Sequence, residues 1–138
     1  MILRRELHAL ADTEALARDL AEKLTGGKTI GLIGELGAGK TTLVKFLVSA
    51  LGANEEVSSP TFVLQHIYQT QKLTIEHWDL YRVRARPEEL DLDAPENVLR
   101  VVEWPEHGEL ACDIEIRLSF AAGGWRVAEI SIRRPAQS

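Results

Sequence analysis

Gly34–Thr42, which reads GELGAGKTT, matches the phosphate-loop pattern G-x-x-x-x-G-K-[ST]. A loop that wraps a triphosphate turns several backbone N–H groups inward, and Gly37 and Gly39 tolerate the backbone angles that this requires. The spacing directs Lys40 to the β- and γ-phosphates and the Thr41 hydroxyl to a Mg²⁺ ion. The stretch therefore predicts a nucleoside triphosphate site, to which the following helix adds its N-terminal dipole.

The flanking residues provide the context that this motif requires. Lys28–Ile33 is a short apolar run suited to a buried strand, and Thr42–Leu51 has a helical pattern that ends at Gly52. The alternative, a chance glycine-rich turn before a helix, is disfavoured by this strand–loop–helix order. The residues expected to contact the nucleotide are Glu35, Leu36, Gly37, Ala38, Gly39, Lys40, Thr41 and Thr42.

Length and composition limit the number of domains and the classes of protein that the chain can belong to. The chain has 138 residues, the size of one domain, with 45% hydrophobic and 27% charged residues, which is ordinary for a globular protein. Its net charge of −5 argues against gripping nucleic acid through an overall positive field. The single cysteine, Cys112, excludes an intrachain disulfide framework. No apolar run approaches the ~20 residues that span a membrane. We therefore expect a cytoplasmic protein.

The N-terminal part of the chain predicts one strand and one helix. Residues 1–7 alternate apolar and charged side chains, as a half-exposed strand does, and residues 12–24 form an amphipathic helical pattern. Asp12 or Thr13 is the expected N-cap of that helix, and the pattern leaves open whether its N-terminus lies near the nucleotide base.

The C-terminal part of the chain predicts a hairpin. Residues 114–120 and 125–133 read as strands, and residues 121–124 form a glycine-containing turn between them. Strand pairs therefore flank the phosphate-loop unit. The expected fold class is α/β, a single-domain P-loop NTPase over residues 1–138 with a mixed parallel/antiparallel sheet flanked by helices.

A second hairpin is predicted in mid-chain, from strands 62–70 and 73–80 joined at Gln71-Lys72. Asp79 falls near the C-terminal end of the second strand, where ligands bind in open α/β sheets. It is a candidate for holding Mg²⁺ through water or orienting the attacking water, and an Asp that caps a turn fits the pattern equally well. His77 is interpreted as a packed strand histidine rather than a catalytic base.

Leu99–Glu103 is an apolar strand that ends in a carboxylate, the Walker B arrangement, with Pro105 ending the strand. Glu103 is therefore expected beside the phosphate loop, where it can coordinate Mg²⁺ directly or through water. Trp104 is expected to be a core or lid aromatic residue.

The segments on either side of the mid-chain hairpin are less specific. Thr61, in the proline-containing stretch of residues 57–62, is a candidate switch residue that senses the γ-phosphate, although a proline-marked loop before a strand fits as well. Residues 82–86 are a basic cluster, interpreted mainly as a solvated face, and Pro87 favours the start of a helix. Residues 90–96 are acidic, contain Pro95 and predict no particular secondary structure.

Taken in order, GELGAGKTT, SSPTF, HWDLYR and VVEWPEHG resemble the bacterial TsaE (YjeE) family, the ATPase component of tRNA threonylcarbamoyladenosine synthesis. The resemblance covers essentially the whole chain. It implies a small mixed-sheet phosphate-loop fold that binds ATP and Mg²⁺. It also implies TsaD and TsaB partners, which place a threonylcarbamoyl group on the adenosine beside the tRNA anticodon. We expect this chain to meet tRNA indirectly, through the complex.

The resemblance also implies roles for single residues. Thr41 and Glu103 resemble the magnesium-site residues, Lys40 the phosphate-binding lysine and Asp79 the essential aspartate. Lys40, Asp79 and Glu103 are therefore the expected catalytic residues. Trp104 resembles the tryptophan beside the nucleotide. Ser59, Pro60 and Thr61 resemble the switch segment, and residues 90–98 depart from the usual helical pattern.

Other classes stay in competition. A small-molecule or nucleotide kinase needs an acceptor pocket and a lid, for which this chain leaves little room. A GTPase needs the guanine-reading N-K-x-D motif, which the sequence lacks, so ATP is favoured. A nucleotide-binding scaffold without turnover is the third alternative. We expect an ATPase that is slow alone, activated in its complex, and monomeric or weakly self-associating.

Overall fold

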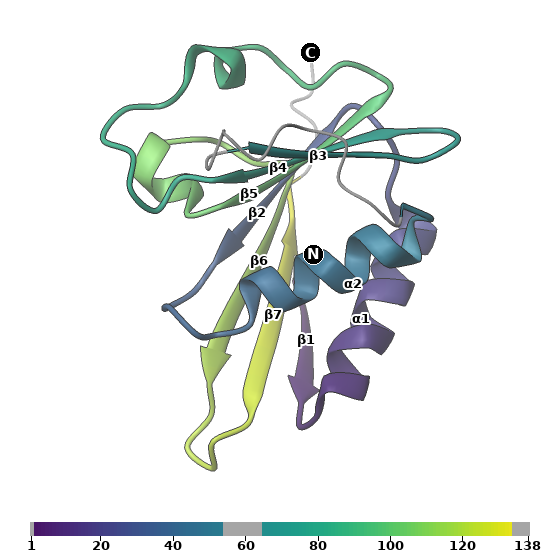
Figure 1. Ribbon diagram of the computed structural model, residues 1–138. Helices are drawn as coiled ribbons and strands as arrows, with labels where there is room; N and C mark the ends of the chain where they lie inside the picture. Colours follow the sequence, from purple (N-terminus) through teal and green to yellow (C-terminus); the bar gives the residue numbers. More distant parts are fainter. Residues whose placement is uncertain (1, 54–64, 134–138) are drawn as a thin grey trace.

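The structure is a computed structural model that describes residues 2–53 and 65–133 (Figure 1). The described residues form one seven-stranded sheet in the order β1-β7-β6-β2-β5-β4-β3. The strands are β1 Ile2–Leu7, β2 Lys28–Ile33, β3 Gln65–Gln69, β4 Thr74–Asp79, β5 Val98–Glu103, β6 Ile114–Phe120 and β7 Arg126–Ile132. The helices are α1 Leu10–Lys23 and α2 Lys40–Ala50, with 3₁₀ turns η1 Glu88–Asp91 and η2 Pro105–Gly108.

The sheet is mixed, which confirms the expected fold class. β2 pairs in parallel with β5 on one side and with β6 on the other, and β4 continues the parallel set beside β5. β1, β7 and β3 each run antiparallel to a neighbour. Both predicted hairpins are present, the mid-chain one as far as the described residues reach. Because β2 lies inside the sheet, the loop that follows it starts at the centre of the sheet edge.

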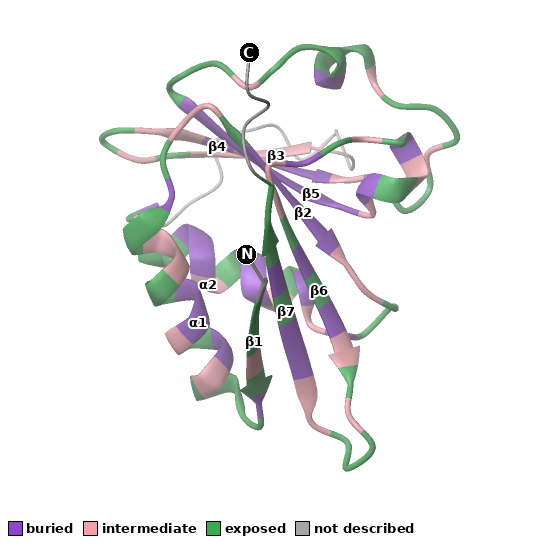
Figure 2. Cartoon of the chain, turned by 180° about the vertical axis from the view of Figure 1, so that it is seen from behind, coloured by how far each residue is buried: buried purple, intermediate pink, exposed green. Residues whose placement is uncertain are grey.

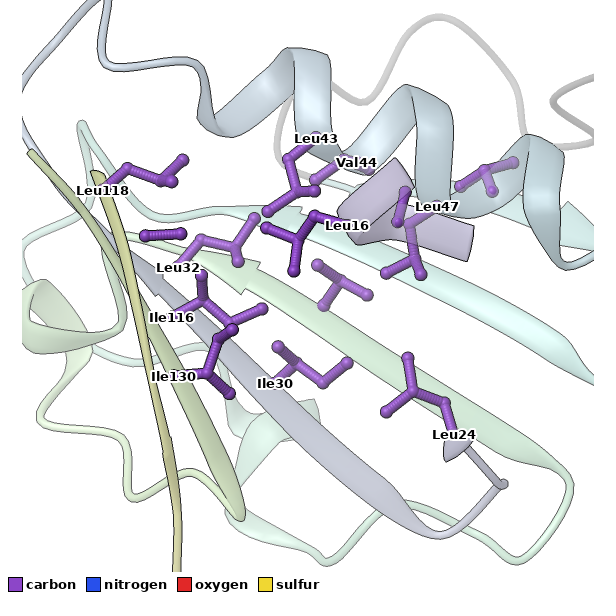
Figure 3. Close-up of a cluster of buried hydrophobic side chains, with 14 of the residues drawn as sticks. Leu16, Leu24, Ile30, Leu32, Leu43, Val44, Leu47, Ile116, Leu118 and Ile130 are labelled. Carbon is purple, nitrogen blue, oxygen red and sulfur yellow. The ribbon is translucent and has the colours of Figure 1, made fainter. Parts of the chain in front are cut away.

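Both helices cover the same face of the sheet (Figure 2). Figure 3 shows α2 placing Leu43 and Leu47 over the strands, where they join Leu16 of α1 above Ile30 and Ile116. These side chains are almost completely buried. Burying each stabilises the fold by about 1.5–3 kcal/mol relative to exposure. This core fixes α2, and with it the phosphate loop at its N-terminus, against β2.

A smaller cluster packs on the opposite face, where Figure 1 shows the connection between β4 and β5. Trp78 and Leu80 meet Leu90 there. Arg100, which is buried, pairs with Glu76 at 3.0 Å and donates to two backbone carbonyls of this connection. The helix expected from Pro87 is only the short turn η1, after which the acidic, proline-containing stretch stays irregular.

The N-cap expected for α1 is wrong. The helix begins at Leu10 with Ala9 in the N-cap position, so Asp12 lies inside the first turn. Its carboxylate accepts hydrogen bonds from the backbone N–H groups of His8, at 2.8 Å, and Ala9, at 3.1 Å. An acid at this N3 position satisfies backbone N–H groups at the start of the helix, as in a capping box, so the helix starts earlier than expected. Thr13 is consequently buried on the first turns.

Cys112 is a buried thiol whose titration is expected to shape stability at alkaline pH. Burial raises the pKa of Cys112 to about 12, and Glu115, Asp113 and Glu106 add to the shift. An unfolded thiol titrates near pH 8.5, so the folded state binds the proton more tightly and stability falls as pH rises through that value. Between about pH 8.5 and pH 10, we expect the free energy of unfolding to fall by roughly 1–2 kcal/mol less in Cys112→Ala than in the wild type. Urea unfolding at both pH values measures it, and parallel declines in the two proteins would refute it.

Candidate nucleotide-binding site

Three strand ends meet at one edge of the sheet. β2, β5 and β4 are parallel neighbours, and their register places Glu103 opposite both Leu32 of β2 and Asp79 of β4. The carboxyl ends of parallel strands lie at the same edge, which is where ligands bind in open α/β sheets. The phosphate loop, Glu103 and Asp79 are therefore brought together, as the sequence predicted.

The loop has the backbone geometry that its sequence predicts. Gly37 and Gly39 have φ of +82° and +102°, in the left-handed region that favours glycine. Ala38 between them is buried. Gly39 is the N-cap residue of α2, which begins at Lys40 rather than at Thr42. The lysine and Thr41 therefore both belong to the first helical turn, whose amides face the anion site.

Lys40 is held in the mouth of the loop. It is only 5% exposed, and its Nζ donates to the Gly34 carbonyl and lies 3.8 Å from the centre of the Trp104 ring. Burial lowers the pKa of Lys40, while the nearby carboxylates of Glu103 and Glu106 oppose that shift. A bound phosphate would favour the charged amine in the same way, so the cation fits an anionic ligand.

Glu103 is the centre of a buried hydrogen-bonded group. Its side chain accepts from the Thr41 hydroxyl, at 3.2 and 3.3 Å to the two carboxylate oxygens. His77 Nε2 lies 2.6 Å from Glu103 Oε2, and both side chains are buried. A hydroxyl and a carboxylate are the hard oxygen donors that Mg²⁺ prefers, so the pair fits that ion.

The interpretation of His77 as a packed strand residue is right about its burial and misses its partner. His77 lies on the same strand face as Asp79 and reaches the acid at the end of the neighbouring strand. The alternation of β4 predicts that His77 and Asp79 share one face, but it does not indicate which neighbouring strand supplies the partner of His77.

Asp79 caps a turn, which is one of the two roles that its position suggested, and it also lies at the candidate site. Its Oδ1 accepts a hydrogen bond from the backbone N–H of Tyr81 at 3.0 Å, which caps the turn after β4. The residue also lines the cavity in front of the loop, together with Glu103.

Aromatic rings close one side of the site. Trp104 follows Glu103 with φ of +58°, an uncommon conformation for a non-glycine residue. Its ring lies 5.0 Å from that of Tyr81 and 4.9 Å from that of His107. His107 is fixed in turn by contacts of its Nδ1 with the backbone carbonyls of Leu80 and Tyr81. Trp104 is thus a wall of the site, and its two aromatic partners were not foreseen from the sequence.

The resulting cavity has a volume of about 300 Å³ and extends well beyond the loop. Every loop residue from Leu36 to Thr42 lines it, whereas Glu35 borders the neighbouring hollow beside Glu106. Its other end is formed by Leu7, Leu10, Thr13, Leu118 and Arg126, none of which the sequence assigned to the nucleotide site. The candidate switch, Ser59, Pro60 and Thr61, lies outside the described residues.

A glycine loop between a central strand and a helix, with acids from two adjacent strand ends, defines a phosphate-loop protein of the nucleotide-binding α/β class. Comparisons agree. The family described as "Threonylcarbamoyl adenosine biosynthesis protein TsaE" matches residues 7–127. The chain belongs to this TsaE family.

Individual relatives support the assignment. The tRNA threonylcarbamoyladenosine biosynthesis protein TsaE of Aquifex aeolicus is 41% identical over 119 residues, covering 83% of this chain and 84% of that protein. The Nostoc protein of the same name is 37% identical over 136 residues, covering 88% and 83%. The crystal structure of YdiB from Bacillus subtilis superposes with a TM-score of 0.75 at 25% identity, covering 96% of this chain and 86% of that one.

Within the described residues, no helix is long and apolar enough to cross a membrane.

Proposed function

We propose that residues 1–138 act as one Mg²⁺-dependent ATPase domain that serves the threonylcarbamoyladenosine modification of tRNA. The observation that carries this proposal is the convergence of Lys40, Thr41, Glu103 and Asp79 at one cavity. Membership of the TsaE family supports the pathway, and the charges of the site support the chemistry.

Each residue has a defined role in this proposal. Lys40 and the loop amides bind the β- and γ-phosphates, and Thr41 and Glu103 hold the metal. Mg²⁺ held by Thr41 and Glu103 would neutralise negative charge on the phosphates. Asp79, at the end of β4, orients the attacking water. Trp104 packs beside the nucleotide, and Ser59, Pro60 and Thr61 remain the predicted switch.

The remaining loop residues contact the nucleotide mainly through their backbone. Leu36, Gly37, Ala38, Gly39 and Thr42 surround the phosphates in this arrangement, and Glu35, which lines the neighbouring hollow, begins the loop beside them.

His77 is expected to fix the orientation of Glu103. Because its ring nitrogen contacts Glu103 Oε2 at 2.6 Å, its loss frees the carboxylate to rotate. We expect His77→Ala to weaken ATP binding about tenfold or more in Mg²⁺ and to leave binding in EDTA nearly unchanged. His77→Gln, which keeps a side-chain N–H, should restore part of the loss. Calorimetric titrations of both variants measure this, and an equal loss with and without the metal would contradict it.

We further propose that TsaD and TsaB activate the ATPase and that tRNA is contacted through them. The arginine that lines the cavity, Arg126, donates to Gly37 rather than to Asp79 or Glu103. Additional positive charge at the γ-phosphate is therefore expected from a partner, as trans-acting arginines supply it elsewhere. The net charge of −5 fits indirect contact with tRNA. We also propose that the protein is cytoplasmic and monomeric or weakly self-associating when alone.

A reconstitution tests the proposal. Unmodified tRNA is incubated with TsaD, TsaB, a threonylcarbamoyl donor and Mg-ATP, with and without this chain, and the digested tRNA is analysed by mass spectrometry. We expect repeated rounds of tRNA modification to require the chain. The control variant Lys45→Ala, which replaces an exposed lysine on α2, should support modification as well as the wild type does. Modification that is independent of the chain would overturn the proposal. Transfer of the γ-phosphate to a small acceptor would instead favour the kinase alternative.

A further inference from the structure

Arg126 occupies a position that the roles described above leave unexplained. It is the first residue of β7 and pairs across the strands with Leu7 at the end of β1. Both residues line the nucleotide cavity, together with Leu10 and Thr13 of α1. This end of the cavity is built from elements on the β6–β7–β1 side of the loop, whereas Glu103 belongs to β5 on its other side.

The side chain of Arg126 is packed directly against the phosphate loop. One terminal nitrogen donates to the Gly37 carbonyl at 2.9 Å. A Cβ placed on Gly39 would stand 3.5 Å from its Cδ and 3.6 Å from its Nε. The guanidinium carbon lies 5.3 Å from the centre of the Phe120 ring, within the range of a cation–π contact. The guanidinium is thus held beside the two loop glycines before any ligand binds.

One donor of this group lacks a partner. Arg126 Nε is buried and has no hydrogen-bond partner among residues 2–53 and 65–133. A buried N–H of a charged group is costly to leave unpaired, and an anionic or hydroxyl oxygen of a ligand would satisfy it after a small side-chain adjustment. The cavity that Arg126 lines supplies a place for such a ligand.

We propose that Arg126 is a nucleotide-binding residue that contacts the ribose and α-phosphate while it holds the loop at Gly37. This inference rests on the proposed function, because it takes the ligand of the cavity to be a nucleotide. The placement follows from the two ends of the site. Lys40, Thr41 and Glu103 serve the β- and γ-phosphates, so Arg126, between the loop and Leu7, meets the portion of the nucleotide nearer the base.

Binding measurements with matched variants test the proposal. Titration calorimetry gives the affinities of ATP and ADP for the wild type and for Arg126→Met, Arg126→Gln, Arg126→Lys and Arg4→Met. Arg4 is an exposed arginine on β1 and controls for the loss of one positive charge. The same titrations at two salt concentrations show whether an ionic contact was lost, and thermal unfolding without nucleotide reports on folding.

We expect Arg126→Met to weaken ATP and ADP by the same factor, roughly tenfold to a hundredfold, because both share the ribose and α-phosphate. Arg126→Gln should lose as much, Arg126→Lys should retain part of the affinity, and Arg4→Met should match the wild type. The affinities for ATP and ADP should depend less on salt concentration in Arg126→Met than in the wild type.

Several outcomes would overturn the proposal. Wild-type affinity in Arg126→Gln would show that Arg126 only holds the loop, and a loss confined to ATP would place it at the γ-phosphate. An equal loss in Arg4→Met would attribute the effect to net charge. If the wild type binds ATP and Lys40→Ala does not, while Arg126→Met binds normally, the inference alone fails. If the wild type binds neither nucleotide, the proposed function itself fails.

Discussion

Lys40→Ala is expected to abolish measurable ATP binding, with an affinity loss of about a hundredfold or more. The buried amine is the cation in the mouth of the loop, and Glu103, Glu106 and Asp79 lie close enough to influence its pKa. Removing it leaves the triphosphate facing these carboxylates without the charge that offsets them.

The measurement is calorimetric titration of Mg-ATP into Lys40→Ala and into Lys45→Ala. Lys45 is exposed and lies farther along α2, so its variant removes the same charge without touching the cavity. Thermal unfolding of both variants verifies that they are folded. An affinity for ATP within a few-fold of the wild type in Lys40→Ala would contradict the assignment of the loop as the phosphate site.

Asp79→Asn is expected to retain ATP binding and to lose about 10²–10⁴-fold in turnover, the contribution that a positioned acid or base makes. The asparagine keeps the oxygen that caps the backbone N–H of Tyr81, so the turn after β4 is preserved. What it loses is the negative charge at the end of that strand, which the proposed water-orienting role requires.

The matched control is Asp93→Asn, an exposed acid in the connection between β4 and β5 that does not line the nucleotide cavity. Affinity is measured by titration and turnover by phosphate release under the same conditions. Equal losses of ATP affinity in Asp79→Asn and Lys40→Ala would contradict this division of labour, because Asp79 would then contribute to binding.

Local sequence patterns predicted most of the fold. Hydrophobic periodicity and the spacing of glycines are properties of short segments, so they predicted β2, the glycine loop and α2. The positive φ of Gly37 and Gly39 agrees with that prediction. The hairpins followed from alternation and turn residues, and the strand-end positions of Asp79 and Glu103 followed from the lengths of their strands. The start of α1 was wrong because the side chain of Asp12 caps from inside the helix.

The parts of the site that escaped prediction depend on contacts between distant segments. His77 of β4 contacts Glu103 of the adjacent strand β5. Arg126, near the C-terminal end of the sequence, donates to the Gly37 carbonyl in the phosphate loop. The pairing of β1 with β7 is what brings Leu7 to the cavity. Strand order and register set these contacts, and a single sequence carries no local pattern for either.

Phosphate release from Mg-ATP, measured with the purified chain alone and then with TsaD, TsaB and tRNA, tests the central claim most directly. The proposal predicts slow release by the chain alone, strong stimulation in the complete mixture, and loss of that stimulation when Asp79→Asn replaces the wild type. Release that is unchanged by the partners, or stimulation that persists in the Asp79 variant, would contradict a partner-activated ATPase centred on this cavity.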